Sequence, residues 1–298
     1  MKLQLALGLG LGGHRKVGGE PYITPVLPEA DSIVRAWSLR RLIPAYKTGI
    51  SIRADRPTDP VGAPGIELTF NNQGLLEFPA GANANAYELY DQKGALTSKF
   101  IQETLAAAPR VFESNVLLKG LKSFLIPDIK FLTMTGGSSY SDATLDTTMG
   151  SGELSISLWT TATSSPYAHH MLFNYQHASA GKWAISWYNG KPHAFCGNTT
   201  GTLISANQYH NTGWVHVVIT IKGTTNGAKL YVNTNLEDTK NVPSKTTGTT
   251  VAPSILALED GTLGANNNIN DIVIWNRELT ASEISQVFNA TAPYYEES

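Results

Sequence analysis

The stretch Asp271–Ile284 constrains the fold of this chain more than any other, because it combines a strand, a turn and the start of a short helix. Residues 272–275, Ile-Val-Ile-Trp, predict a strand that is buried on both faces. Thr280 and Glu283 have the spacing of a capping box, in which each side chain accepts a hydrogen bond from the other residue's backbone N–H. A strand that ends in a small helix laid across the mouth of a sheet is a closing element. We therefore expect the rest of the chain to form a β-sandwich.

Strand signals precede this closing element from residue 131 onward. Residues 154–159 alternate apolar and polar side chains, and residues 215–221 form a continuous apolar run. The pair Asn189-Gly190 separates two apolar stretches, which is the signal of a tight β-hairpin. These patterns predict an all-β protein with many turns.

The composition argues against several classes of function. The chain has 298 residues, with 24 acidic and 22 basic side chains and a pI near 6.4. This balance gives no electrostatic basis for binding nucleic acid or an anionic membrane, and no apolar run is long enough to span a bilayer. Cys196 is the only cysteine, which excludes an intrachain disulfide and a zinc site built on cysteine pairs.

The first 13 residues carry a leucine at every second position. Strict alternation of this kind predicts a strand whose apolar face consists of Leu3, Leu5, Leu7, Leu9 and Leu11. A signal peptide is the alternative, but four glycines interrupt the segment and no small-residue cleavage site follows it. An isolated strand cannot bury such a face alone, so we expect these leucines to bind a neighbouring chain by strand addition.

The chain divides into three segments. Residues 1–31 comprise this arm and a proline-rich spacer at 20–31, which is expected to hold the body at a fixed distance. Residues 32–128 form a block that either folds separately or supplies strands to the sandwich of residues 129–298. Asp31 or Ser32 is placed to cap a helix over residues 33–42. Residues 98–109 have strong helix propensity, which predicts a helix that ends before Pro109.

Three segments of the body resemble one known family. DIVIWNRELTASEISQVFN at 271–289 resembles the closing motif of laminin G-like domains, which are concanavalin A-like jelly rolls. GELSISLWTTA at 152–162 and GWVHVVITIKG…AKLYVNTNLE at 213–237 resemble the opening and central strands of that family, in the expected order. The resemblance spans residues 131–289 and implies a jelly-roll sandwich with a short C-terminal closing helix. It leaves the function open, because this fold serves adhesion, sugar binding and hydrolysis alike.

Residues 32–126 carry a second resemblance, to the start of the catalytic domain of fungal-type α-L-arabinofuranosidase B. The matching positions are Ser38, Arg40 or Arg41, Leu42, Tyr46, Arg53, Arg56, Asp59, Tyr90, Asp91, Gln92 and Gly94. The cysteines of those enzymes are absent here, and Lys93 stands where they have serine. This resemblance implies irregular chain over residues 98–109, where the helix propensity predicts a helix. The same block, shortened and fused to a laminin G-like domain, is similar to one found in tailed-phage structural proteins.

Glycoside hydrolysis needs a pair of carboxyl groups, about 5–5.5 Å apart for retention and wider for inversion. The candidates on the body are Asp142, Asp146, Glu153, Glu237, Asp238, Glu259, Asp260 and Asp271. None lies in a motif that matches the arabinofuranosidase nucleophile or acid. We expect them to solvate loops or to form hydrogen bonds at turns and strand ends, and we expect Asp91 to hold a turn through bonds to the backbone.

Histidine and amide side chains offer two candidate metal sites. The first would use His169, His170 and His177, although adjacent residues of an extended segment point to opposite sides. The second is a calcium site built from Glu259, Asp260, Asn266, Asn267, Asn268 and Asp271. His216 alternates with valines and is expected to be a hydrogen-bonded histidine of the core.

The tryptophans are expected mainly in the core. Trp159 and Trp275 belong there together with Tyr231, while Trp183 and Trp187 share one face of a strand. That face either packs inside or meets a ligand, and the core is favoured. With Tyr188, Tyr209 and Trp214, these two tryptophans are fewer than a sugar-stacking platform and a core together would use.

These features together predict a non-enzymatic phage virion protein of a head or tail appendage. The arm is expected to anchor it to other virion proteins, with a trimer as the expected homo-oligomer. The lectin-like sandwich is expected to decorate the particle or to bind a host surface glycan. No cofactor is expected, calcium being the only alternative. The alternative function is a glycoside hydrolase or depolymerase acting on envelope polysaccharide, and the alternative location is extracellular.

Overall fold

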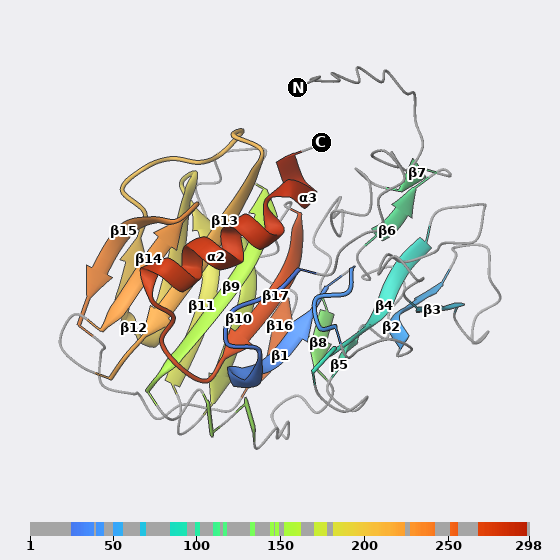
Figure 1. Ribbon diagram of the computed structural model, residues 1–298, viewed down its shortest axis with the longest axis horizontal. Coiled ribbons are helices and arrows are strands. Elements are labelled where there is room, and N and C mark those ends of the chain that lie inside the picture. The colour runs from blue at the N-terminus through green and yellow to red at the C-terminus, as the bar shows by residue number, and fades with distance from the viewer. Residues whose placement is uncertain are drawn as a thin grey trace, which may run out of the picture.

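The computed structural model describes residues 25–38, 40–44, 50–55, 66–69, 84–93, 99–101, 110–113, 116–117, 132–134, 144–145, 147–148, 152–161, 170–177, 181–223, 227–241, 251–255 and 268–296. The leucines of the predicted arm, Leu3 to Leu11, lie outside these residues. Within the described part, two antiparallel β-sheets and a short C-terminal helical segment form the architecture (Figure 1). The predicted all-β sandwich with a closing helix is confirmed.

The smaller sheet has six strands, each antiparallel to its neighbours. Their order is β1 (Ile33–Trp37), β17 (Ile269–Trp275), β9 (Leu154–Thr161), β13 (Trp214–Ile221), β14 (Ala228–Val232) and β15 (Asn235–Lys240). An early strand of the chain and its last strand lie side by side in this sheet, because β1 pairs with β17. The predicted strands over 154–159, 215–221 and 272–275 all lie here.

The larger sheet has eleven strands in the described residues. Nine follow the order β12 (Lys191–Ile204), β11 (Gly181–Tyr188), β10 (His170–His177), β16 (Val251–Ile255), β8 (Leu132–Met134), β5 (Lys99–Ile101), β4 (Ala84–Tyr90), β2 (Ile50–Asp55) and β3 (Ile66–Thr69). The other two are β6 (Arg110–Glu113), which pairs with β4, and β7 (Val116–Leu117), which pairs with β6. The block of residues 32–128 therefore shares backbone hydrogen bonds with the sandwich, through the β5–β8 pair and the β1–β17 pair.

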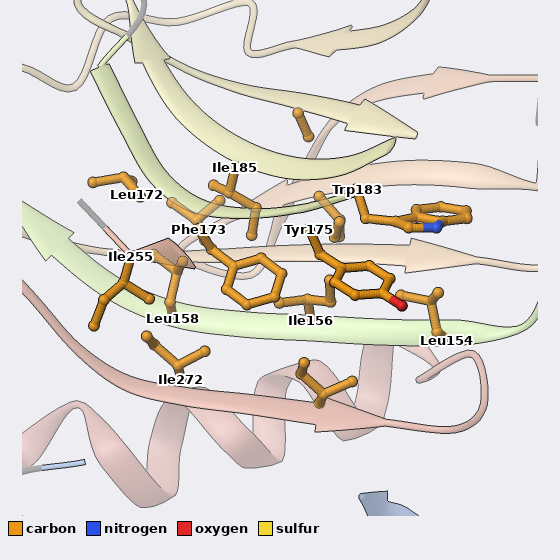
Figure 2. Packing of buried hydrophobic residues seen from close by; sticks show 14 of the residues in the cluster. Leu154, Ile156, Leu158, Leu172, Phe173, Tyr175, Trp183, Ile185, Ile255 and Ile272 are labelled. Atoms are coloured by element: carbon orange, nitrogen blue, oxygen red, sulfur yellow. The ribbon is translucent and has the colours of Figure 1, made fainter. Parts of the chain in front are cut away.

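Alternation along β9 explains how the two sheets pack. Leu154, Ile156 and Leu158 point between the sheets, where they meet Phe173 and Tyr175 of β10 (Figure 2). The serines between these residues face the opposite side of the sheet. A fully buried leucine, isoleucine or phenylalanine contributes about 1.5–3 kcal/mol relative to an exposed one, so this interface supplies the main stabilisation of the sandwich.

The closing helix lies on the outer face of the six-stranded sheet rather than across its mouth (Figure 1). Helix α2 (Ala281–Thr291) begins with the predicted capping box, in which the amide of Glu283 donates to Thr280 Oγ1 at 3.3 Å and the amide of Thr280 donates to Glu283 Oε2 at 2.7 Å. The outer face of the sheet is apolar and needs a cover, which explains this position. The apolar side chains that pack together beneath the helix include Val218, Tyr231, Val273, Trp275, Ile284 and Val287. The short helix α3 (Pro293–Glu296) follows.

The predicted helix over residues 33–42 is wrong. Residues 33–37 form β1, and all five of its side chains are buried. Only a single 3₁₀ turn, η1 (Ala30–Ser32), precedes the strand. β-Branched residues such as Ile33 and Val34 favour a strand, and pairing with β17 outweighs the weak helical preference of the segment. In the region of the other predicted helix, residues 99–101 form β5, and residues 102–109 lie outside the described part.

Residues 25–29 pack on the sandwich, which differs from the expected free-standing spacer. Leu27 is buried in the apolar cluster that also holds Trp275. The indole N–H of Trp275 donates to the carbonyl oxygen of Pro28 at 3.2 Å. A buried indole N–H needs an acceptor, and the proline-rich segment supplies it.

Two side chains of the block at residues 32–128 bind β1 and the residues that follow it. Asp91 Oδ1 accepts from the amide of Ala36 at 2.8 Å and from that of Lys93 at 3.0 Å, so the predicted turn-holding role of Asp91 is confirmed. Gln92 Oε1 accepts from the amide of Leu42 at 2.7 Å, and its Nε2 donates to the carbonyl oxygen of Arg40 at 2.7 Å. These bonds hold Ala36, Arg40 and Leu42 in place.

The segment held in this way carries a buried ion pair to the sandwich. Arg40 Nε donates to Asp271 Oδ2 at 3.0 Å, and Ser38 Oγ donates to Asp271 Oδ1 at 2.5 Å. Both charged side chains are 2% exposed. The guanidinium of Arg40 also lies 4.1 Å from the ring centroid of Tyr294 in α3. Several matching positions of the second resemblance therefore join the block, β17 and the C-terminal helices.

Candidate functional site

The tip of the β11–β12 hairpin forms the first part of a candidate site. Asn189 and Gly190 link the strands with φ values of 51° and 74°, as a tight hairpin turn with two left-handed residues requires. Gly190 has a second constraint, because a Cβ at this position would lie 2.5 Å from Nδ1 of His210. The predicted hairpin is confirmed, and its turn residues also make room for a neighbouring loop.

That loop, residues 204–213, lies against the hairpin. The amide of Tyr209 donates to the carbonyl oxygen of Gly190 at 2.9 Å, and the amide of Ser205 donates to that of Pro192 at 3.0 Å. The ammonium of Lys191 donates to the carbonyl oxygen of Ala206 at 2.7 Å. Hairpin and loop therefore form one connected surface.

A β-bulge in β15 holds the same loop from the other side. Leu230 pairs with Asp238, but the next residue of β14, Tyr231, pairs with Leu236, so Glu237 is the extra residue. A bulge turns an additional side chain toward one side of a strand. As a result, two adjacent carboxylates bind one loop: Asp238 Oδ2 accepts from the amide of Ile204 at 3.0 Å, and Glu237 Oε2 accepts from that of Ala206 at 3.1 Å.

Glu237 is the central acceptor of this arrangement. Its oxygens also accept from Tyr209 Oη at 2.6 Å, Ser205 Oγ at 3.0 Å and the amide of Asn207 at 3.3 Å. Partial burial alone raises the pKa of Glu237, but the hydrogen bonds from Tyr209, Asn207 and Ser205 outweigh it and lower the pKa below its ordinary value. The pKa of Tyr209 is raised to about 12, first by burial and then by its bond to Glu237. Glu237 is therefore an ionised anchor with a neutral tyrosine as its donor.

We call the surface formed by residues 188–191, 204–213 and 235–240 the hairpin rim. It carries three of the exposed large apolar or aromatic side chains in the described part of the chain: Tyr188 (39% exposed), Ile204 (41%) and Leu236 (54%). The fourth, Val26, lies before β1. An exposed aromatic ring on hydrogen-bonded loops is an arrangement suited to binding a ligand.

Comparison with known proteins assigns the fold family. The family model of laminin G type, described as the concanavalin A-like lectin/glucanases superfamily, matches residues 135–285, just over half of the chain. The chain belongs to this superfamily. No curated protein matches it.

Several solved structures of botulinum neurotoxins align with this superfamily member. The binding domain of botulinum neurotoxin DC in complex with rat synaptotagmin II is 14% identical, with a TM-score of 0.47, and the match covers 88% of this chain and 52% of that one. The same binding domain in complex with SialylT is 14% identical, with a TM-score of 0.45 and coverages of 88% and 52%. A third structure, described as "Cell entry of botulinum neurotoxin type C is dependent upon interaction with two ganglioside molecules", is 15% identical, with a TM-score of 0.47 and coverages of 88% and 51%. The chain spans about half the length of these structures.

The superfamily includes glucanases, and glycoside hydrolysis uses a pair of carboxyl groups. The positions of the carboxylates in this chain therefore bear on its function. Strands β8, β10, β11, β12 and β16 of the large sheet contain no Asp or Glu. Glu88 on β4 of the same sheet is buried and accepts hydrogen bonds from Tyr90 and Lys99. Glu237 and Asp238 accept hydrogen bonds from the loop, and Asp271 binds Arg40. Glu153 is exposed. Asp142, Asp146, Glu259 and Asp260 lie outside the described residues.

A serine, a histidine and an aspartate lie near one another on the outer face of the small sheet. Ser157 Oγ and His216 Nε2 are hydrogen-bonded at 2.8 Å, which confirms His216 as a hydrogen-bonded core histidine. All three side chains, those of Ser157, His216 and Asp271, are at most 2% exposed, and the rings of Trp159 and Phe288 lie 5.1 and 5.9 Å from the histidine ring. Asp271 is already bound by Arg40. These residues therefore hold the core together and are not placed as a catalytic triad for a substrate.

The candidate metal sites receive no support from the described residues. Within them, no group of three or more His, Cys, Asp or Glu side chains is placed to hold a metal ion. His169 and four members of the calcium candidate (Glu259, Asp260, Asn266 and Asn267) lie outside the described part. The other two members have protein partners, because Asn268 donates to Thr161 Oγ1 at 3.0 Å and Asp271 binds Arg40.

The tryptophans lie where the sequence favoured them. Trp183 and Trp187 are 1% and 0% exposed and belong to the core between the sheets. Trp159 stacks on Tyr295 of α3 with ring centroids 4.3 Å apart. Tyr188, which follows Trp187 in the strand, is instead 39% exposed. The sequence named Tyr188 and Glu237 separately but gave no sign that they belong to one surface, because the bulge that turns Glu237 toward the loop depends on the register of two strands.

Proposed function

We propose that this superfamily member is a non-enzymatic, lectin-like binding protein that recognises a glycan on a cell surface. The hairpin rim is the observation that carries the proposal. Its loops are fixed by backbone bonds and by the two carboxylates of β15, so binding there would order few additional groups. Its exposed tyrosine offers the kind of rigid amphipathic surface that binding sites use.

Binding is favoured over hydrolysis by the state of the carboxyl groups. A glycosidase needs one carboxyl group that is protonated near neutral pH and a second one opposite it. Glu237 has the reverse property, since its hydrogen bonds favour the ionised form. The alternative function, a glycoside hydrolase or depolymerase, would need an acid pair other than Glu237, which is ionised, and Asp271, which binds Arg40.

We place this binding protein in the appendage of a phage virion. Two features of the sequence support the placement: the leucine alternation of the arm and the block similar to that of tailed-phage structural proteins. The arm residues Leu3, Leu5, Leu7, Leu9 and Leu11 would pair with other virion proteins, and a trimer would allow three rims to bind one cell surface together. An extracellular location is the alternative.

A glycan microarray probed with the full-length chain tests the binding proposal. We expect reproducible binding to a defined subset of glycans, and no shortening of those glycans when the protein is incubated with them and the products are separated by size. Absence of binding across a broad array would refute the glycan-binding function. Release of shorter oligosaccharides would favour the hydrolase alternative.

A further inference from the structure

We infer that the hairpin rim binds an uncharged pyranose, whose C–H face packs on the ring of Tyr188. This inference rests on the proposed glycan-binding function and names the ligand class of the same site. The axial C–H groups of a pyranose form an apolar, weakly positive face, and the face of an aromatic ring is weakly negative. The face of a tyrosine ring therefore suits such a sugar.

The ring of Tyr188 is held in place before any ligand arrives. Tyr188 is the last residue of β11 and pairs with Lys191 across the tight turn. The imidazole of His193, on the paired strand, lies with its centroid 6.0 Å from that of the tyrosine ring. A side chain at the end of a paired strand loses little conformational freedom on binding, so more of the contact energy appears as affinity.

The turn and the loop of the hairpin rim carry exposed amides. Asn189 lies at the tip of the turn, and Gln208 and Asn211 lie on the loop that packs against it; all three are exposed. Amide side chains donate and accept hydrogen bonds without carrying charge. They match the hydroxyl groups of a neutral sugar, each of which is also both a donor and an acceptor.

The charges of the rim balance one another, which argues against an acidic sugar. The only formally charged residues in 188–191, 204–213 and 235–240 are Lys191, Lys240, Glu237 and Asp238. Lys240 lies 3.5 Å from Asp238, and the ammonium of Lys191 donates to Ala206. Glu237 keeps its negative charge because its pKa is lowered. A sialic or uronic acid would gain no net attraction here, whereas stacking on Tyr188 does not depend on charge.

The test is titration of the full-length protein with matched neutral and sialylated oligosaccharides, the neutral ones chosen from the array hits. We expect wild type to prefer the neutral member of each pair. Its Kd should change less than about twofold between low and high salt, because no ion pair is screened. Tyr188→Ala should weaken binding roughly tenfold, and Tyr188→Phe should keep most of the affinity because the ring remains.

Two controls separate this inference from the proposed function. Val26→Ala removes an exposed apolar side chain that lies before β1, outside the hairpin rim, and should leave the affinity unchanged. Unchanged melting temperatures of the variants would show that they are folded. If wild type binds glycans but Tyr188→Ala binds them equally well, or if only acidic glycans bind, the inference is overturned while the proposed function stands. If wild type binds no glycan at all, both are overturned.

Discussion

Burial gives His216 an unusual protonation behaviour. The ring lies beneath α2 and α3, beside Trp159 and Phe288, with Ser157 as its hydrogen-bond partner. Burial lowers its pKa to about 3, and the opposing effect of the negative charge of Asp271 on β17 is smaller. The closing helices therefore cover a histidine that is neutral in the folded chain over most of the pH range.

This pKa predicts that acid destabilises the fold through His216. Between pH 6.5, its ordinary pKa, and about 3, the unfolded chain binds a proton at this site and the native chain does not. The free energy of unfolding should consequently fall as the pH falls, by roughly 1.4 kcal/mol per pH unit. Denaturant unfolding of wild type and His216→Phe between pH 7 and 5 measures this, and the variant should show a flatter dependence. His210→Asn, at a half-buried histidine, is the control, and equal slopes for wild type and His216→Phe would contradict the prediction.

Cys196 is a second residue whose chemistry the core controls. Its thiol is fully buried between the sheets, and burial raises its pKa to about 12. Because the thiolate is the reactive form, we expect no reaction of the native protein with a disulfide reagent and complete reaction after unfolding in denaturant. Leu236→Cys adds an exposed cysteine and provides a rapidly reacting control. Rapid labelling of Cys196 in the native wild type would show that the core opens locally.

At the scale of the elements, alternation in the sequence predicted strands well and bulges poorly. The strand over 154–159, the hairpin at Asn189-Gly190 and the capping box of α2 follow from local chemistry, and all three are present. The bulges of β15 and β17 depend on pairing with strands elsewhere in the chain, so nothing within their own sequences marks them. Residues 33–42 show the opposite error, because a local helical preference was outweighed by pairing of β1 with β17.

The bulge in β17 holds Asp271 in an unfavourable backbone conformation, and the ion pair between Asp271 and Arg40 offsets this free-energy cost. Asp271 has a φ of 50°, in the left-handed region that few residues other than glycine and asparagine adopt easily. This conformation places its carboxylate on Arg40 and Ser38, which belong to the segment held by Gln92. The block of residues 32–128 is thus joined to the sandwich by a buried ion pair as well as by apolar contacts.

Asp271→Asn should therefore destabilise the protein strongly. Asparagine tolerates the same backbone conformation but leaves the guanidinium of Arg40 buried without a counter-charge, which costs about 3–5 kcal/mol. Equilibrium unfolding in denaturant measures the change. The double variant Arg40→Met with Asp271→Asn should recover part of the loss, since the unpaired charge is gone.

A matched control for Asp271→Asn comes from the surface. Lys240→Ala breaks the ion pair with Asp238, in which the lysine side chain is 53% exposed, and should cost less than about 1 kcal/mol. If Asp271→Asn were as mild as Lys240→Ala, the buried pair would not be what joins the block to the sandwich.

At the scale of the whole molecule, the described residues bury large apolar clusters against one another. The core between the sheets, the cluster beneath α2 and the segment from Pro25 onward bury one another. Among the described residues, no helix is long and apolar enough to cross a membrane. The leucine alternation of residues 3–11 lies outside the described residues, and its binding to another chain stays a prediction.

Removal of residues 1–19 should consequently leave the fold intact and abolish assembly. We expect the truncated protein to keep the circular dichroism spectrum and melting temperature of wild type and to retain glycan binding. In a complementation assay it should be missing from purified particles. Normal incorporation of the truncated protein would refute the anchoring role of the arm.

Charge substitutions on the two faces of the arm test its mode of binding more sharply than deletion. In a strand, side chains at successive positions point to opposite sides, so Leu5→Asp with Leu9→Asp places charges on the apolar face, and Gln4→Asp with Ala6→Asp places the same number on the other. If the arm joins its partner by strand addition with the leucines buried, only the first pair should prevent incorporation into particles. Equal loss with both pairs would show that net charge, and not the leucine face, decides assembly. Loss with neither pair would remove the arm from the binding surface altogether.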